Sequence, residues 1–142
     1  MVELPIELKE CERCLEDALM RCEGPEDMWR AIREVEQRVA AVEDVESKNW
    51  GTILLARYRF TTATAFPAEC DVGEALRGYL DALPVAALYE RAHAVLAACG
   101  VSPALRSTWL PPLIAELEAR DTGARPWHAM VADARRMFAA AG

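Results

Sequence analysis

The sequence predicts an all-α protein: a single compact helical domain over residues 1–142, with about seven or eight helices and an N-terminal antiparallel hairpin. Three observations predict this fold. Apolar residues recur every three or four positions through most of the chain, as in amphipathic helices. Prolines and single glycines separate these periodic segments. Of the 142 residues, 53% are hydrophobic and 27% are charged, which is typical of one globular domain with a closed core.

The predicted hairpin occupies residues 1–48. Its first helix lies between residues 4 and 22, and its apolar side consists of Leu4, Leu8, Cys11, Leu15, Ala18, Leu19 and Cys22. Gly24 suits the end of this helix, and Pro25 suits the first turn of a second one. Because the connection is short, we expect the two helices to pack antiparallel.

The stretch "LLARYRFTTATAF", residues 54–66, is compatible with two structures. As a strand it would present arginines on one face and aromatic rings on the other, which suits single-stranded nucleic acid. As a helix, with Ser47 or Asn49 as its N-cap, it is apolar on nearly every side, as central helices are. The sequence contains no second strand-like run, and unpaired backbone groups are costly to bury. We therefore predict a buried helix over residues 53–65.

The rest of the predicted bundle, residues 49–142, is also helical. After the central stretch, helices are expected over residues 72–83, 84–99, 102–110, 111–123 and 125–141. Gly100 is expected to end one of them, and Ser102 to cap the next. Pro111 and Pro112 are expected to break the chain between two helices.

The net charge of −7 is concentrated in the N-terminal third of the chain. Residues 1–48 carry 14 acidic and 7 basic side chains, and the remainder is neutral overall. Such a surface repels phosphate backbones and favours a basic protein partner. A general nucleic-acid binder would instead show a basic domain or stripe.

Cysteine usage and the absence of targeting segments predict a cytoplasmic protein. The five cysteines lack the spacing of a small secreted disulfide framework, and the N-terminal segment does not resemble a secretory signal. No apolar run reaches the ~18 residues of a membrane span, so no membrane contact is expected. Cys11, Cys14 and Cys22 share the apolar side of an acidic helix, where thiolates are not stabilised. We interpret them as packing residues and expect neither a metal nor a cofactor.

Other motifs for chemistry are incomplete. Glu90 and His93 have the E-x-x-H spacing of a di-iron ligand pair, but the second such motif is missing. The chain has two histidines, no nucleophile elbow and no glycine-rich phosphate loop. The sequence therefore gives no catalytic residue and favours a protein that is not an enzyme.

Two surfaces remain as candidates for contact with a partner. On the first helix, Glu12, Glu16, Met20 and Glu23 share the side away from the apolar residues. Exposed methionine among carboxylates suits an adaptable protein contact. A second, basic surface near the C-terminus carries Arg120, Arg125, Arg135 and Arg136. It complements the acidic hairpin, either within the molecule or across a homodimer.

The leading functional hypothesis is a non-enzymatic, cytoplasmic protein-binding module, of the adaptor, inhibitor, immunity or chaperone type. Its acidic hairpin would contact a basic partner. The alternative is a helical-bundle enzyme or small-ligand sensor, with a pocket near Tyr58, Tyr89, Glu90 and His93. Nucleic-acid binding through the arginine-rich C-terminus ranks third.

Overall fold

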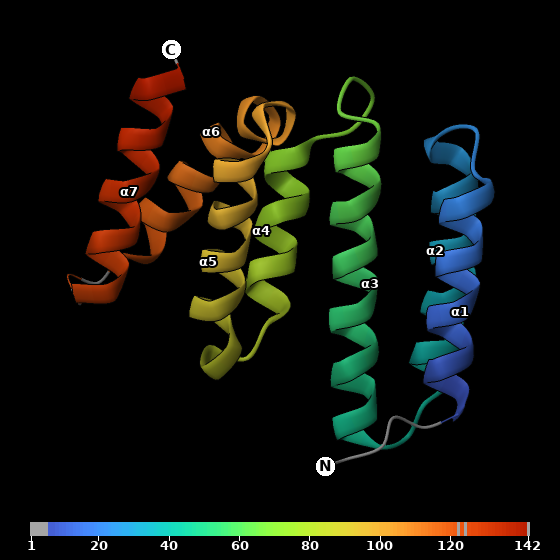
Figure 1. Ribbon diagram of the computed structural model, residues 1–142. Helices are drawn as coiled ribbons and strands as arrows, with labels where there is room; N and C mark the ends of the chain where they lie inside the picture. The colour runs from blue at the N-terminus through green and yellow to red at the C-terminus, as the bar shows by residue number, and fades with distance from the viewer. Residues whose placement is uncertain (1–5, 122, 124, 142) are drawn as a thin grey trace. The chain divides into compact units, whose positions relative to one another are not determined.

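The structure is a computed structural model that describes residues 6–121, 123 and 125–141. Within these residues the chain forms seven α-helices and no strand, which confirms the all-α prediction (Figure 1). The helices are α1 (Ile6–Arg21), α2 (Pro25–Ala40), α3 (Val45–Ala65), α4 (Val72–Ala82), α5 (Val85–Val101), α6 (Pro103–Arg120) and α7 (Arg125–Ala141). None of the described helices combines the length and the apolar composition needed to cross a bilayer.

Contacts between residues divide the chain into two compact units, Met1–Cys70 and Asp71–Gly142. The first unit contains α1, α2 and α3, and the second contains α4 to α7. The contacts of α3 therefore group it with the acidic hairpin. A single domain over residues 1–142 stays a prediction.

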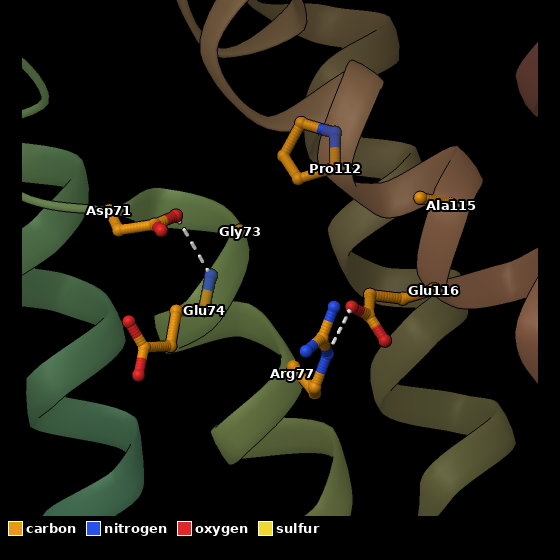
Figure 2. A pocket seen from close by; sticks show the side chains of 7 residues that line it. All are labelled: Asp71, Gly73, Glu74, Arg77, Pro112, Ala115 and Glu116. Carbon is orange, nitrogen blue, oxygen red and sulfur yellow. Dashed lines mark hydrogen bonds and ion pairs between the residues drawn. The ribbon is translucent and has the colours of Figure 1, made fainter.

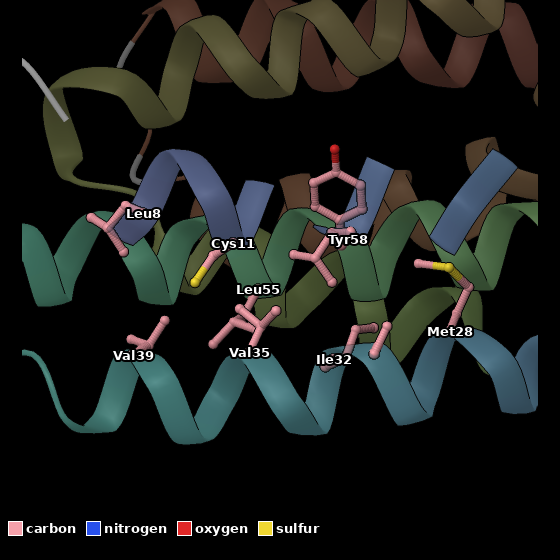
Figure 3. Packing of buried hydrophobic residues seen from close by; sticks show 10 residues of the cluster. Leu8, Cys11, Met28, Ile32, Val35, Val39, Leu55 and Tyr58 are labelled. Carbon is pink, nitrogen blue, oxygen red and sulfur yellow. The ribbon is translucent and has the colours of Figure 1, made fainter. Parts of the chain in front are cut away.

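In the first unit, α1 and α2 form the predicted antiparallel hairpin, and α3 packs against both. Gly24 has extended backbone at the N-cap of α2, and Pro25 occupies the first turn. The three helices close around one apolar cluster (Figure 3). Its buried members are Leu8, Cys11 and Leu15 from α1; Met28, Ala31, Ile32, Val35 and Val39 from α2; and Leu55 and Tyr58 from α3. Burial of each large apolar side chain contributes about 1.5–3 kcal/mol, so this cluster is the main source of stability in the unit.

The ambiguous central stretch is helical, as predicted, but α3 begins earlier than expected. Its N-cap is Asp44 rather than Ser47 or Asn49. The hydroxyl and the backbone N–H of Ser47 both donate to Oδ2 of Asp44, at 2.7 Å and 2.9 Å. These hydrogen bonds lower the pKa of Asp44. The serine thus supports the cap from inside the first turn.

Helix α3 is buried on two sides, as its apolar circumference predicted. One side belongs to the core cluster of the first unit. The other side carries Ala56, Phe60 and Ala63, all buried. Thr62 is also buried, and its hydroxyl donates to the backbone carbonyl of Tyr58 at 2.7 Å. A helix satisfies its own backbone groups, which explains why this threonine-rich stretch does not form a strand.

In the second unit, α6 packs against α4, α5 and α7. The most deeply buried leucines of the second unit are Leu76 and Leu80 from α4 and Leu110, Leu113 and Leu117 from α6. Ser102 caps α6 as predicted, because its hydroxyl accepts a hydrogen bond from the backbone N–H of Leu105 at 3.3 Å. Helix α5 continues through Gly100 to Val101, two residues beyond the predicted end at Cys99.

The predicted break at Pro111 and Pro112 is wrong, because both prolines lie inside the continuous helix α6. A proline in a helix interior removes one backbone hydrogen bond and costs about 3 kcal/mol. The leucines on both sides of the prolines, Leu110 and Leu113, are fully buried. Packing on both sides therefore keeps the two halves in one helix. Two predicted helices are consequently one, and the described residues contain seven helices, within the predicted seven or eight.

Candidate functional site

The predicted partner-binding residues lie in the first unit, on α1 and in the turn that follows it. Met20 is 85% exposed, and Glu16 and Glu23 are exposed as well. Glu16 lies one turn before Met20, so the two share a side of the helix. In the described part of the chain, neither glutamate carboxylate forms an ion pair. We call Glu16, Met20 and Glu23 the α1 face.

Glu12, the fourth predicted contact residue, is engaged within the protein. Its Oε1 accepts a hydrogen bond from Nη2 of Arg57 at 3.1 Å, and its side chain is only 34% exposed. The guanidinium of Arg57 also lies over the ring of Tyr58, 5.1 Å from its centroid. Arg59 pairs with Glu36 of α2. Both arginines of the ambiguous stretch therefore hold α3 to the hairpin.

The cysteine motif contributes to packing. Cys11 is 1% exposed and belongs to the core cluster (Figure 3). Cys14 and Cys22 are partly buried against that cluster, and the thiol of Cys22 donates to the carbonyl of Leu19 at 3.3 Å. The described residues contain no group of three His, Cys, Asp or Glu side chains placed to hold a metal ion. A metal-free native protein stays a prediction.

The predicted basic surface lies in the second unit and is largely compensated. Arg120, Arg135 and Arg136 each form an ion pair with a carboxylate of the same unit. Arg125 is exposed at the start of α7. Three of the four arginines thus already have an anionic partner, which leaves less free positive charge for nucleic acid than the sequence suggests.

The four residues of the alternative pocket fall into different units. Tyr58 is a core residue of the first unit. Tyr89, Glu90 and His93 are exposed on α5 of the second unit. There Tyr89 stacks on His93, with ring centroids 6.2 Å apart, and meets Trp127 of α7 edge-on at 5.7 Å. These three rings form a surface contact between α5 and α7.

A pocket that the sequence did not predict lies between α4 and α6, entirely within the second unit (Figure 2). Its volume is about 300 Å³. It is lined by Asp71, Gly73, Glu74, Arg77, Pro112, Ala115 and Glu116. Asp71, Glu74 and Arg77 are exposed, so the pocket is an open depression rather than an enclosed cavity.

Glu116 is the buried charge of this pocket, with a side chain only 7% exposed. Nε of Arg77 donates to one of its oxygens at 2.9 Å, and Nη1 of Arg120 donates to the other at 2.7 Å. Burial by itself raises the pKa of Glu116, but the hydrogen bonds from Arg120 and Arg77 outweigh it and lower the pKa below its usual value. Glu116 is therefore ionised at neutral pH. Arg120 also reaches Asp81 of α4, so the network joins the two helices.

These pocket residues meet only in the folded chain. Arg77 and Glu116 are 39 positions apart and lie on different helices, so no spacing rule links them. The sequence does contain one sign that Glu116 has a charged partner. Glu116 lies between Leu113 and Leu117 on the buried side of α6. A charge at a buried position requires a partner of opposite sign. That rule predicts an arginine or lysine nearby but does not say which one.

The described residues thus offer two places for a partner or a ligand. The first is the α1 face of the first unit, and the second is the pocket between α4 and α6 of the second unit. Comparisons of this chain with protein-family models, with curated proteins and with solved structures found no match.

Proposed function

We propose that the chain is a non-enzymatic protein-binding module, of the adaptor, inhibitor, immunity or chaperone type, whose acidic hairpin contacts a basic partner. The observation that carries this proposal is the exposure of Met20, 85%, beside two glutamates that form no ion pair among the described residues. Among the described large apolar side chains of the first unit, Met20, Val45 and Trp50 are exposed, and Met20 is the most exposed of them, so it is available for a contact outside the unit.

The chemistry of the α1 face suits a partner surface with arginine or lysine around an apolar centre. A methionine side chain is flexible and adapts to an irregular apolar surface. The carboxylates of Glu16 and Glu23 accept hydrogen bonds from guanidinium or ammonium groups. The hairpin carries the whole net charge of −7 in residues 1–48, which accelerates the approach of a basic protein. Because Glu12 is bound to Arg57, we assign the contact to the other three residues.

The test is affinity capture from the native host, followed by quantitative mass spectrometry and measurement of Kd for the captured protein. The informative variant is Glu16→Lys combined with Glu23→Lys. Its matched control is Glu34→Lys combined with Glu43→Lys, which changes the net charge equally at exposed glutamates of the same unit that carry no described ion pair. Glu12 is left intact, because its substitution would also break the contact between α1 and α3.

We expect the Glu16/Glu23 variant to weaken binding about tenfold or more, mainly through a slower association that depends on salt. Met20→Ala should raise the dissociation rate instead, with little salt dependence. The control should bind as the unsubstituted chain does, within about threefold. Equal loss in both charge variants would show a general charge effect and contradict a contact at the α1 face.

A further inference from the structure

We propose that the pocket between α4 and α6 binds a small zwitterion, a free α-amino acid. Its carboxylate would bind the guanidinium of Arg77, and its ammonium group would bind the carboxylates of Asp71 and Glu74. This site belongs to the second unit and is independent of the protein contact proposed for the α1 face.

Glu116 holds the guanidinium of Arg77 in place, but this contact uses only part of its hydrogen-bonding capacity. Only its Nε donates to Glu116, and the two terminal nitrogens have no hydrogen bond within the described residues. Figure 2 shows this group between Glu116 and the side of the pocket that carries Glu74. Glu116 is itself fixed by Arg120, so the guanidinium is oriented before a ligand arrives. A terminal arginine fork of this kind is suited to a carboxylate.

The opposite side of the pocket supplies negative charge. Oδ1 of Asp71 accepts the backbone N–H of Glu74 at 3.0 Å, which leaves the second carboxylate oxygen of Asp71 available. The carboxylate of Glu74 is exposed and forms no described ion pair. The hydrogen bond and the charge of Glu116 raise the pKa of Arg77, and the charges of Asp81 and Asp71 add smaller contributions in the same direction. Acceptors for an ammonium group and donors for a carboxylate therefore line one pocket.

This distribution of charge selects against simpler ligands. Asp71, Glu74 and Glu116 repel a free anion, because Arg77 and Arg120 do not fully compensate three carboxylates. Arg77 in turn repels a bare cation, and no described group of side chains is placed to hold a metal ion. A ligand that carries an ammonium group and a carboxylate on the same carbon satisfies both sides of the pocket.

The size of the pocket agrees with such a ligand. A volume of about 300 Å³ is at the small end for ligand sites. Pro112 and Ala115 of α6 provide an apolar wall, and Gly73 of α4 adds no side chain to the pocket. A Cβ atom at Gly73 would lie 3.4 Å from Cβ of Pro112, in ordinary contact. Gly73→Ala is therefore tolerated, whereas Gly73→Leu would place a side chain in the space of the ligand.

The test is a nuclear magnetic resonance titration of the full chain, with backbone amide shifts as the readout. The probes are glycine, L-alanine and L-leucine. Each is compared with the amine and the carboxylic acid that lack its second charged group; for leucine these are 3-methylbutylamine and 4-methylpentanoate. The variants are Arg77→Gln and Gly73→Leu. Arg91→Gln is the control, since Arg91 is exposed on α5 and carries no described ion pair.

At least one amino acid should produce saturable shifts at Gly73, Glu74 and Ala115, with a Kd of about 10 mM or tighter. The single-charge analogues should bind about tenfold or more weakly, as expected when one charged hydrogen bond is lost. Arg77→Gln and Gly73→Leu should abolish the shifts, and Arg91→Gln should not. The proposal is overturned if no amino acid saturates the site, if an analogue binds equally well, or if Arg77→Gln binds unchanged.

Discussion

At the scale of single residues, Glu116 shows how a buried charge is tolerated. Its two oxygens are occupied by two different arginines, and its side chain is almost inaccessible to water. Removing one member of such a network leaves the other charged groups without their partner, which costs more than the pair contributes. Arg77 is largely exposed and solvent reduces its share, so the buried contact with Arg120 dominates.

We therefore predict that Glu116→Gln lowers the free energy of unfolding by about 2 kcal/mol at neutral pH. The pKa of Glu116 in the folded protein lies below the usual value of 4.5, so the unfolded chain binds the proton more tightly. The stabilisation by the ionised group is therefore complete above that usual value and decreases as the pH falls through the lower, folded pKa. Urea unfolding of both proteins across this range should show the difference shrinking in acid.

Glu118→Gln serves as the control for this prediction. Glu118 pairs with Arg135, and both side chains are well exposed to solvent. Exposed ion pairs contribute roughly 0–1 kcal/mol, so this variant should hardly differ from the unsubstituted chain. A stability difference for Glu116→Gln that stays constant into acid would mean that ionisation of Glu116 is not the cause.

The sequence predicts exposure of single residues better than it predicts their partners. Met20 was expected on the outer side of the first helix, and it is strongly exposed, because periodicity determines the side of a helix. Glu12 was expected on the same outer side, but it lies nearer to α3 and pairs with Arg57, 45 positions away. Such a contact depends on how two helices pack, which the spacing along one helix does not contain.

At the scale of elements, the packing of α2 on α3 depends on a glycine. A Cβ atom at Gly51 would lie 2.7 Å from Cγ1 and 2.9 Å from Cγ2 of Val39. Val39 is buried, and a valine in a helix has essentially one χ1 rotamer, so its methyl groups cannot move aside. Gly51 therefore permits the close approach of the two helices, although glycine is a poor helix former.

We predict that Gly51→Ala destabilises the protein by about 1 kcal/mol, because overpacking of about 1–3 kcal/mol exceeds the gain of about 1 kcal/mol in helix propensity. Gly78→Ala in α4 is the matched control, since no atom lies within 4 Å of its added Cβ, and it should stabilise. In a Val39→Ala background, Gly51→Ala should no longer destabilise. Denaturant unfolding of these variants decides between steric conflict and propensity; stabilisation by Gly51→Ala alone would contradict the steric account.

The helices themselves were largely predictable, because apolar periodicity and end signals act locally. Sequence reasoning failed at Pro111 and Pro112, where the local rule favours a break. There the burial of Leu110 and Leu113 on the two sides of the prolines outweighs the local cost. The same reasoning explains why the pocket between α4 and α6 was missed: its walls come from two helices separated by a third.

At the scale of the whole chain, the net negative charge is concentrated in the hairpin, residues 1–48, whereas the apolar core of the first unit also includes residues of α3. Residues 1–70 carry 15 acidic and 9 basic side chains, whereas residues 71–142 carry 8 and 7. The acidity predicted for the hairpin is thus a property of the first unit, and the second is nearly neutral. The core of the first unit, however, extends past the hairpin to Leu55 and Tyr58 of α3.

This core leads to a prediction about fragments. A fragment of residues 1–70 contains all three helices of the cluster and should be helical by circular dichroism, with a cooperative thermal transition. A fragment of residues 1–48 retains the hairpin and its charge but lacks Leu55 and Tyr58 of α3, which leaves the apolar side of the hairpin in water. Isolated helices of this length are marginal in water without packing, so the shorter fragment should be mostly unfolded. Equal helicity and cooperativity in both fragments would show that the hairpin is a folding unit by itself, whereas an unfolded longer fragment would show that the cluster does not suffice.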